Sequence, residues 1–421
     1  MISRFYLFAR TSKMFIPLLC MSLLMLGAGF INTVCSLKLK MMGHTSFFVG
    51  IITSLFYLGM FLGSFHISHI LIRVSYIRTY AAFASFFAFS ILILATSDNL
   101  FIWSLSRFIA GYCLAGLYIT LESWLLNVSN EKNRSSYLAL YVASIYGAQA
   151  VGQLFIDIIA IDTMMPFIFG TVFVILSIIP FCATPIISPK IRDTKALGIK
   201  KLFAASPTGV VGSFVSGLFI AATYGLLPIY VLDEGVLLDN VSVVMSLNII
   251  GGVVLQYPFG RLSDRIDRRL ALIILCGVAS IVSIFIMFLD YFPMLSSDAS
   301  KVISLALIFV LGGIIFCIFP ISMNHMCDYI EKTHVIEATQ GLSVAYGLGA
   351  VCGPLIIAGF MKALGAIGFF IGISALFAIT AVYTLYRVIK SRRPLEAQSS
   401  GIIVVPSAIP LVSELELKKD K

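Results

Sequence analysis

The sequence has few charged residues. Only 12% of its 421 residues are Asp, Glu, Lys or Arg, whereas 59% are hydrophobic and the mean hydropathy is +1.02. Soluble globular domains carry about 25% charged residues, because charge keeps their surfaces in water. The shortage of charge excludes a soluble domain and predicts an integral membrane protein.

Enzyme signatures are also missing. The sequence contains no Gly-x-Ser-x-Gly, no His-Glu-x-x-His and no phosphate-binding loop, so no enzyme and no cofactor are expected. All eight cysteines lie in or beside apolar segments without a paired motif, which argues against disulfides. Neither His66 with His69 nor the group His325, Cys327 and Asp328 supplies a metal cage, so no metal site is expected.

Long apolar runs dominate what is present. A helix needs about 20 apolar residues to cross hydrocarbon, and barrel strands alternate in segments of roughly ten. The runs lie at about 14–36, 46–71, 77–96, 100–126, 136–160, 164–187, 209–232, 241–260, 270–289, 302–324, 338–361 and 364–388. Their length predicts an all-α membrane protein with twelve transmembrane helices.

Basic residues gather on one side of this predicted topology. They precede the first run and fill loop 188–208, whereas the opposite loops offer only Lys38, Lys40, Lys301 and Lys362. By the positive-inside rule, both termini lie in the cytoplasm and the chain is a multi-pass protein of the cytoplasmic (inner) membrane. The net charge of +9 reflects this bias, so no nucleic-acid partner is expected.

The chain contains two copies of one pattern. Gly260 to Arg269 (GRLSDRIDRR) ends one apolar run, and Ser68 to Ile77 ends an earlier one, with Arg73 in the place of Arg265. Later signs agree: Glu131-Lys132, Tyr146-Gly147 and Ala150-Val151 return as Glu331-Lys332, Tyr346-Gly347 and Ala350-Val351. We expect two pseudo-symmetric six-helix bundles, 1–187 and 209–390, joined by a cytoplasmic linker, 188–208, and followed by a flexible cytoplasmic tail, 391–421. Two homologous halves in a membrane are typical of secondary transporters.

The repeated loop resembles the signature loop of the major facilitator superfamily, and the two halves and basic central loop agree with that family. Closer similarity is to its YcaD-like branch, in the stretches 73–78, 122–125, 227–230 and 256–261. The resemblance implies the major facilitator fold, alternating access, a small-molecule substrate and membrane lipids as partners. We expect a monomer.

Loop 260–269 is interpreted as a latch on the cytoplasmic side. Gly260 permits close helix contact, and Asp264 can accept hydrogen bonds from free amides at a helix N-terminus. Arg265, Arg268 and Arg269 can pair with carboxylates or lipid phosphates. A simpler alternative is that these arginines only mark topology.

The resemblance implies where this latch acts. Asp264 is expected near Ser135 and Ser136, at the start of the fifth helix, where it helps to hold the outward-facing state. The earlier copy has Ser68 and Ile72 in place of the Gly and Asp, so a symmetric pair of latches is not expected.

Charges inside the apolar runs are costly and are therefore functional candidates. Arg107 resembles the superfamily's helix-4 arginine, which is associated with substrate or proton coupling; alternatively it snorkels to the outer surface. Glu122 either exchanges protons or pairs with Arg73, Arg78 or Arg134 at the inner gate.

Neutral polar residues in the runs predict the cavity. With Arg107, the candidates are Asn32, Thr33, Tyr57, Tyr118, Gln149, Gln153, Tyr224, Asn248, Gln256 and Tyr346. Amides and hydroxyls suit uncharged or zwitterionic solutes. Because Arg107 is a buried cation, an organic acid is also a candidate substrate. Each group can instead bond a neighbouring helix.

The sequence therefore predicts a secondary active transporter of a small polar solute, coupled to protons. Stretch 147–153 lacks the Gly-Pro signature of many drug/proton antiporters. Small residues there, such as Ala143 with Gly147 and Ala148 with Gly152, are alternatively helix-packing contacts. Export of drugs or siderophore-like metabolites stays open, and a non-transporting membrane sensor is the alternative of another class.

Overall fold

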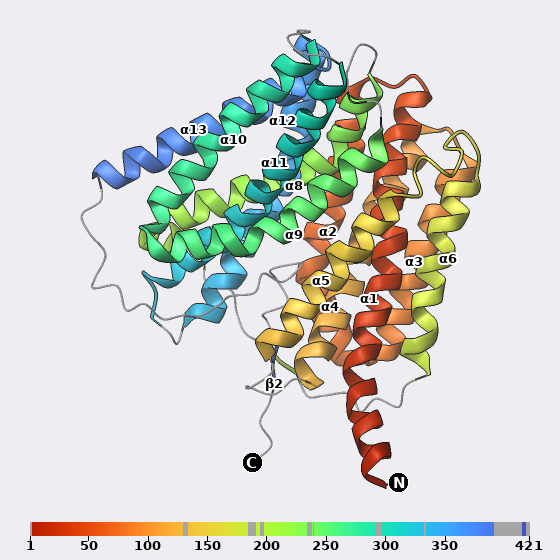
Figure 1. Ribbon diagram of the computed structural model, residues 1–421. Coiled ribbons are helices and arrows are strands. Elements are labelled where there is room, and N and C mark those ends of the chain that lie inside the picture. Colours follow the sequence, from red (N-terminus) through yellow and green to blue (C-terminus); the bar gives the residue numbers. More distant parts are fainter. Residues whose placement is uncertain are drawn as a thin grey trace.

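The computed structural model is built almost entirely of long helices in two groups (Figure 1). It describes residues 2–128, 134–183, 191–193, 198–233, 238, 240–291, 297–331, 334–390 and 415–417. The first half contains α1 (Ile2–Met41), α2 (Ser46–Val74), α3 (Tyr76–Thr96), α4 (Leu100–Val128), α5 (Arg134–Gln153) and α6 (Met165–Cys182). The second half contains α8 (Pro207–Leu232), α9 (Val241–Arg265), α10 (Arg268–Tyr291), α11 (Ser297–Cys327), α12 (Val335–Leu364) and α13 (Gly368–Lys390). A short helix, α7 (Ile199–Ala205), precedes α8.

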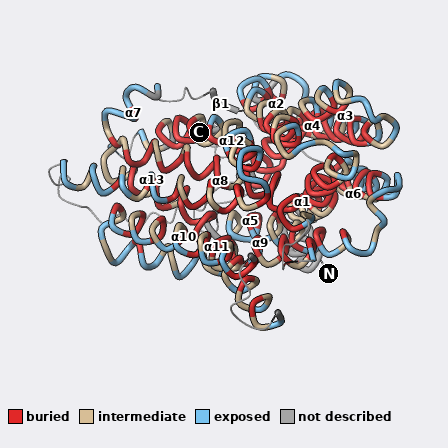
Figure 2. Tube along the Cα trace, turned by 90° about the horizontal axis from the view of Figure 1, so that it is seen from above, coloured by how far each residue is buried: buried red, intermediate tan, exposed pale blue. Residues whose placement is uncertain are grey.

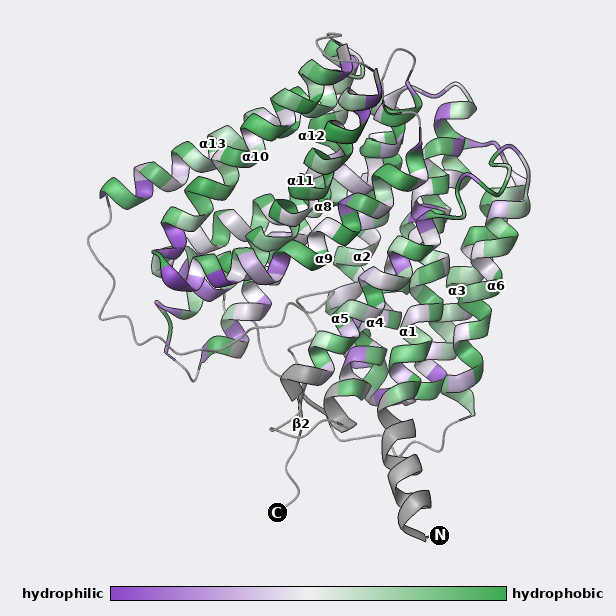
Figure 3. Ribbon diagram, in the orientation of Figure 1, coloured by the Kyte–Doolittle hydropathy of each residue, from purple (hydrophilic) through white to green (hydrophobic). Residues whose placement is uncertain are grey.

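The helices carry an apolar exterior that suits lipid. Among the described residues, 11 helices are long and apolar enough to cross a membrane. The remaining long helix, α5, packs against α1 and α9 and completes the first set. Apolar residues cover the outer faces (Figure 3), and large ones such as Phe89, Ile281 and Val382 are more than 60% exposed. The expected all-α membrane fold is confirmed.

Buried residues concentrate where the helices face one another (Figure 2). α1, α2, α5, α8, α9 and α12 form the contacts between the halves, whereas α3, α6, α10 and α13 lie outside them. Because both faces of α8 are covered by protein, 83% of its most apolar stretch is buried. This places the polar groups of the inner helices away from lipid.

Glycines show the duplication in atomic detail. A Cβ on Gly111 of α4 would lie 1.8 Å from the carbonyl oxygen of Phe56 in α2, and one on Gly59 would lie 2.0 Å from that of Phe108. In the second half, a Cβ on Gly251 of α9 would lie 1.9 Å from the carbonyl oxygen of Phe309 in α11. One on Gly312 of α11 would lie 2.0 Å from that of Asn248 in α9. Each half therefore has, at this equivalent position, a helix crossing so close that only glycine fits on both sides.

The halves touch near one end of the molecule. We call the end where α6 finishes and α8 begins the linker side, and the opposite end the far side. On the far side, Lys40 of α1 forms an ion pair with Asp233 after α8 at 3.7 Å, and the Ser246 hydroxyl donates to the Ala150 carbonyl at 3.0 Å. Towards the linker side, the ends of the two halves lie apart (Figure 1). This conformation is closed on the far side.

The linker and the tail share one small sheet. β1 (Ile191–Asp193) pairs antiparallel with β2 (Leu415–Leu417), with Arg192 opposite Glu416. β2 belongs to the predicted tail, and at this segment its backbone is paired with the linker. The expected boundaries of halves, linker and tail stay a prediction.

Candidate functional site

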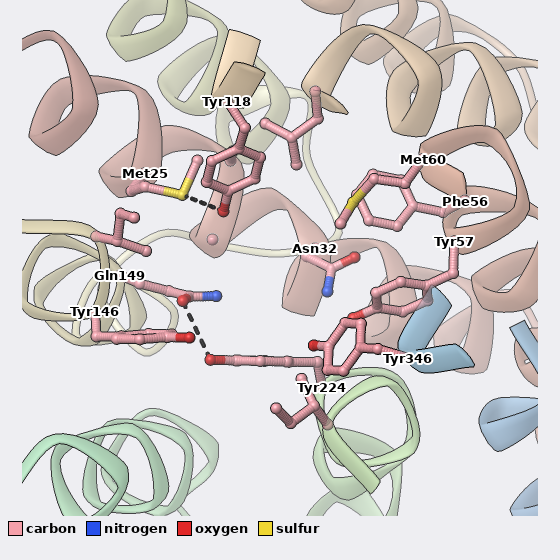
Figure 4. A pocket seen from close by; sticks show the side chains of 15 residues that line it. Met25, Asn32, Phe56, Tyr57, Met60, Tyr118, Tyr146, Gln149, Tyr224 and Tyr346 are labelled. Atoms are coloured by element: carbon pink, nitrogen blue, oxygen red, sulfur yellow. Dashed lines mark hydrogen bonds between the residues drawn. The ribbon is translucent and has the colours of Figure 1, made fainter. Parts of the chain in front are cut away.

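A cavity of about 70 Å³ lies between the two halves (Figure 4). α1, α2, α4 and α5 contribute most of its wall, and α8 and α12 close it from the second half. The lining residues are Met25, Ala28, Gly29, Asn32, Phe56, Tyr57, Met60, Leu114, Tyr118, Ile145, Tyr146, Gln149, Ile220, Tyr224 and Tyr346. In this conformation it has room for only a few waters, so a solute would require the walls to move.

Five tyrosines, Tyr57, Tyr118, Tyr146, Tyr224 and Tyr346, surround this space. The Tyr224 hydroxyl donates to the Gln149 side-chain oxygen at 3.1 Å, which joins the two halves across the cavity (Figure 4). The Tyr118 hydroxyl lies 2.9 Å from the Met25 sulfur, a weak acceptor. The wall is thus apolar in body and carries hydroxyls and amides as its polar groups.

Arg107 lies directly behind this wall. Its guanidinium donates to the Asn32 side-chain oxygen and stands 4.1 Å from the centre of the Phe56 ring. It is 3% exposed and therefore does not snorkel to the outer surface. No ion pair of Arg107 with a carboxylate occurs among the described residues. A buried cation with neutral neighbours gives the cavity a positive potential.

Four of the neutral residues predicted for the cavity, Thr33, Gln153, Asn248 and Gln256, are not part of its lining. Gln153 is fully buried between α5 and α1, where it accepts from Thr33 at 2.8 Å and donates to the Gly29 carbonyl at 3.0 Å. It stands one helical turn beyond Gln149, which is enough to move it from the cavity into a dry helix interface. Asn248 is 1% exposed at the α9–α11 crossing, and half-buried Gln256 is not part of the lining. In this conformation these four side chains lie outside the cavity lining, because position within the membrane does not give the direction of a side chain.

Sequence reasoning also missed part of the lining. Tyr146 stands at the repeat position of Tyr346, so the duplication offered a signal for it. Met25, Phe56 and Met60 carry no such signal, because apolar residues in apolar helices look alike whether they face a cavity, a helix or lipid.

A second polar group lies on the linker side of the second half. Arg268 pairs with Asp328 at 2.9 Å and with Asp264 at 3.7 Å, and it also donates to the Asn324 carbonyl. Next to it, Arg269 pairs with Asp267 at 2.8 Å. The Arg269 hydrogen bonds lower the pKa of the Asp267 carboxyl, whereas burial raises the pKa of Asp328. The contacts of Arg268 with Asp328 and the Asn324 carbonyl fasten the start of α10 to the end of α11, whereas the other two pairs lie within the α9–α10 segment.

The predicted latch does not bridge the halves in this conformation. The Asp264 side chain is 60% exposed, and Arg73, Arg78 and Arg265 are exposed as well. A Cβ on Gly260 would meet nothing within 4 Å, so Gly260 makes no close helix contact in this conformation. The latch lacks these contacts because the two halves are separated on the linker side. The side chains of Ser135 and Ser136 lie outside the described residues.

The expected small-residue packing on α5 holds at one of two positions. A Cβ on Gly152 would lie 2.6 Å from the Leu26 carbonyl oxygen, whereas one on Gly147 would meet nothing within 4 Å. Gly147 is exposed and has no neighbouring helix against it, although Tyr146 beside it lines the cavity.

Glu122 is 3% exposed inside the first half. It lies within electrostatic range of the fully buried Tyr141 of α5, whereas Arg73 and Arg78 are exposed. The side chain of Arg134, the third partner predicted from sequence, lies outside the described part of the chain. Glu122 is thus a buried carboxyl on the linker side of the cavity.

The profile of the Major Facilitator Superfamily matches residues 18–330 and 209–415, which overlap and cover most of the chain. The chain belongs to this superfamily. Facilitators are multi-pass membrane transporters, so the prediction of a transporter and not an enzyme is confirmed.

Relatives and solved structures agree with the assignment. An uncharacterized MFS-type transporter, YcaD of Escherichia fergusonii, is 27% identical over 342 residues, 81% of this chain and 86% of its own. A second, of Enterobacter sp., is 28% identical over 354 residues, 83% and 90% of the two chains. The nucleoside transporter NupG superposes with a TM-score of 0.70 at 14% identity over 91% of this chain and 100% of its own. A POT family transporter superposes with a TM-score of 0.69 at 11% identity, over 90% of this chain and 96% of its own. The likeness to YcaD and the facilitator fold are confirmed.

Asp264→Ala is expected to shift the population towards the linker-side-open conformation. Asp264 contributes little to the conformation described, where it is exposed, so its removal weakens only the opposite state. Cysteine probes on the far side should therefore react more slowly in Asp264→Ala than in the parent protein. Equal labelling rates would contradict the latch.

Proposed function

We propose that this facilitator is a secondary active transporter that moves a small polar solute by alternating access. In this proposal it works as a proton-coupled monomer in the cytoplasmic membrane with both termini in the cytoplasm. The linker side is then the cytoplasmic side, and the conformation described is inward-facing. The main support is the cavity between the halves, which Tyr224 and Gln149 bridge with a hydrogen bond.

The chemistry of the wall favours a solute that presents oxygen acceptors. Arg107 occupies the oxygen of Asn32, and Figure 4 shows the Asn32 amide nitrogen directed into the cavity. That nitrogen can only donate, and the tyrosine hydroxyls that line the cavity can donate as well as accept. With the positive charge of Arg107 behind them, they suit a carboxylate better than an ammonium group. We therefore propose a small carboxylate-bearing solute, such as an organic acid or a zwitterion.

Thermal stability of the purified protein across a solute panel tests this substrate class. A ligand that binds the folded state raises the midpoint by mass action. Monocarboxylates and amino acids should stabilise the protein more than sugars, polyamines or nucleosides. The panel includes nucleosides, peptides and 5-aminolevulinic acid, because the similar solved structures are a nucleoside transporter and POT family transporters in complex with a conjugated peptide or with 5-aminolevulinic acid.

A matched pair of variants tests whether a stabilising solute occupies the cavity. Tyr346→Phe should weaken binding several-fold, since one donor is lost at about 1 kcal/mol. Tyr257→Phe removes a hydroxyl from a side chain that is 73% exposed and should bind as the parent does. Flux of the solute into liposomes then establishes transport, and a panel without any binding or flux would favour the sensor alternative.

Glu122→Gln tests the proton role of the buried carboxyl in α4. If Glu122 carries a coupled proton, uptake driven by a pH gradient should fall at least tenfold, while solute exchange without a gradient persists. Measurements in liposomes with and without an imposed pH gradient distinguish gradient-driven uptake from solute exchange. Uptake that stays fully pH-dependent would remove Glu122 from the coupling mechanism.

A further inference from the structure

The second half contains a buried carboxyl that the central cavity does not use. Asp290, in the last turn of α10, is 9% exposed. The Tyr230 hydroxyl of α8 donates to one of its oxygens at 2.5 Å, and the Ser304 hydroxyl of α11 lies 3.5 Å from the other. Among the described residues, no ion pair includes Asp290. Its described partners are thus neutral hydroxyls.

Neighbouring elements supply few charges at this end of the molecule. On α11, Asp298 and Lys301 stand in the first turns, before Ser304. The first turn of α13 brings Phe369 and Phe370, whose rings lie 6.0 and 4.7 Å from the Tyr230 ring. The charged residues of α9 and α13 lie on the linker side, at the opposite ends of those helices. The described partners of Asp290 are therefore two hydroxyls, and the Tyr230 ring that carries one of them packs against two phenylalanine rings.

Asp290 is connected to the contact between the halves through α8. Tyr230 stands three residues before Asp233, whose backbone amide donates to the Tyr230 carbonyl at 3.2 Å. Asp233 in turn forms the far-side ion pair with Lys40 of the first half at 3.7 Å. The end of α8 is thus held by Asp290 within its own half and by Lys40 across the interface. A change at Asp290 acts on the segment that closes the far side.

We propose that Asp290 is a proton-binding site that links far-side closure to protonation. Burial between neutral groups disfavours an ionised carboxylate, so the far-side-closed conformation holds Asp290 more readily with a proton on one carboxyl oxygen. When the end of α8 moves outward and water reaches the site, that proton returns to far-side water and the carboxylate is hydrated. Acidic solution on the far side therefore favours closure, and higher pH favours opening.

This site rests on the proposed function, of which it would be a second proton-linked group. Asp290 and Glu122 belong to different halves of the protein and lie at opposite sides of the membrane. Glu122 lies in α4 on the linker side, whereas Asp290 acts on the end of α8. Loss of Asp290 should uncouple closure from pH and leave the wall of the central cavity unchanged.

A distance measurement across the far side tests the proposal without any substrate. Spin labels at Met164→Cys and Leu364→Cys, two exposed positions beside far-side helix ends of the two halves, report opening in a background without the eight native cysteines. As the pH rises from about 5 to about 8, the long-distance population should grow in the parent protein. Asp290→Asn should remain at the short distance throughout. The matched control, Asp298→Asn at an exposed carboxylate, should behave as the parent.

Tyr230→Phe provides a second variant that keeps the carboxyl. Tyrosine donates to the ionised form, so its loss should move the midpoint of opening to higher pH by about one unit. The proposal is overturned if Asp290→Asn follows the parent pH response, or if the midpoint in Tyr230→Phe is unchanged. A normal pH response of the distance in a protein that moves no solute would instead overturn the proposed function and leave this site standing.

Discussion

Gly111→Ala is expected to lower the thermal midpoint of the protein by several degrees and to reduce its yield in the membrane. The added Cβ would overlap the Phe56 carbonyl oxygen, 1.8 Å away, so α2 and α4 must separate along their crossing. Overpacking of this kind costs about 1 to 3 kcal/mol, and contact with backbone leaves no flexible side chain to give way. Thermal unfolding followed by size-exclusion chromatography measures the effect.

The duplication provides both a repeat of this experiment and a control. Gly312→Ala overlaps the Asn248 carbonyl oxygen at the equivalent crossing of the second half, 2.0 Å away, and should cost as much. Gly277→Ala in α10 meets nothing within 4 Å and should leave the midpoint unchanged or raise it slightly. Equal midpoints in all three variants would show that these crossings do not determine the packing of the halves.

Arg107→Gln is expected to weaken binding of a carboxylate solute about 10- to 100-fold, in line with the 1.5 to 3 kcal/mol of a charge-assisted hydrogen bond. The substitution removes the cation behind the wall and leaves Asn32 without the donor that orients its amide. The fold should persist, because the guanidinium has no carboxylate partner whose charge would be left uncompensated among the described residues.

Ligand-induced shifts of the thermal midpoint, measured at increasing solute concentration, give the change in affinity for Arg107→Gln. Arg107→Lys retains the charge without the planar fork and should lie between the parent and Arg107→Gln. Lys201→Gln removes one positive charge from an exposed side chain of α7 and should bind as the parent. If Arg107→Gln binds carboxylates with the parent's affinity, the proposed substrate class is wrong.

Several features of the site were accessible from sequence because they depend on chemical type and period. Asn32, Tyr57, Tyr118, Gln149, Tyr224 and Tyr346 are polar residues inside apolar runs, and all six line the cavity. Gln153 has the same chemistry as Gln149 and stands only one turn away, yet it bonds Thr33 and the Gly29 carbonyl in a dry interface. Polarity predicted that these groups need partners, but which partner each finds depends on helix rotation.

The latch shows a second reason why a site cannot be fully predicted from sequence. The sequence places Asp264 and Gly260 at a helix end, but a residue that works between two conformations shows its contacts only in one of them. Here the linker-side ends lie apart, so Asp264 pairs within its own half. Asp290 was missed for a related reason: it stands at the end of an apolar run, where a carboxylate usually marks the edge of the membrane, and only the fold buries it against Tyr230.

The sequence by itself determined the class of the protein, its helices, its duplication and its superfamily, because apolar run length, repeated residue pairs and signature spacing are properties of the chain. Tertiary structure alone decided which polar groups face the cavity, which carboxyls are buried and which side is closed. Those features depend on how helices rotate and tilt against one another, since a turn of 100° per residue converts a small difference in packing into a different neighbour.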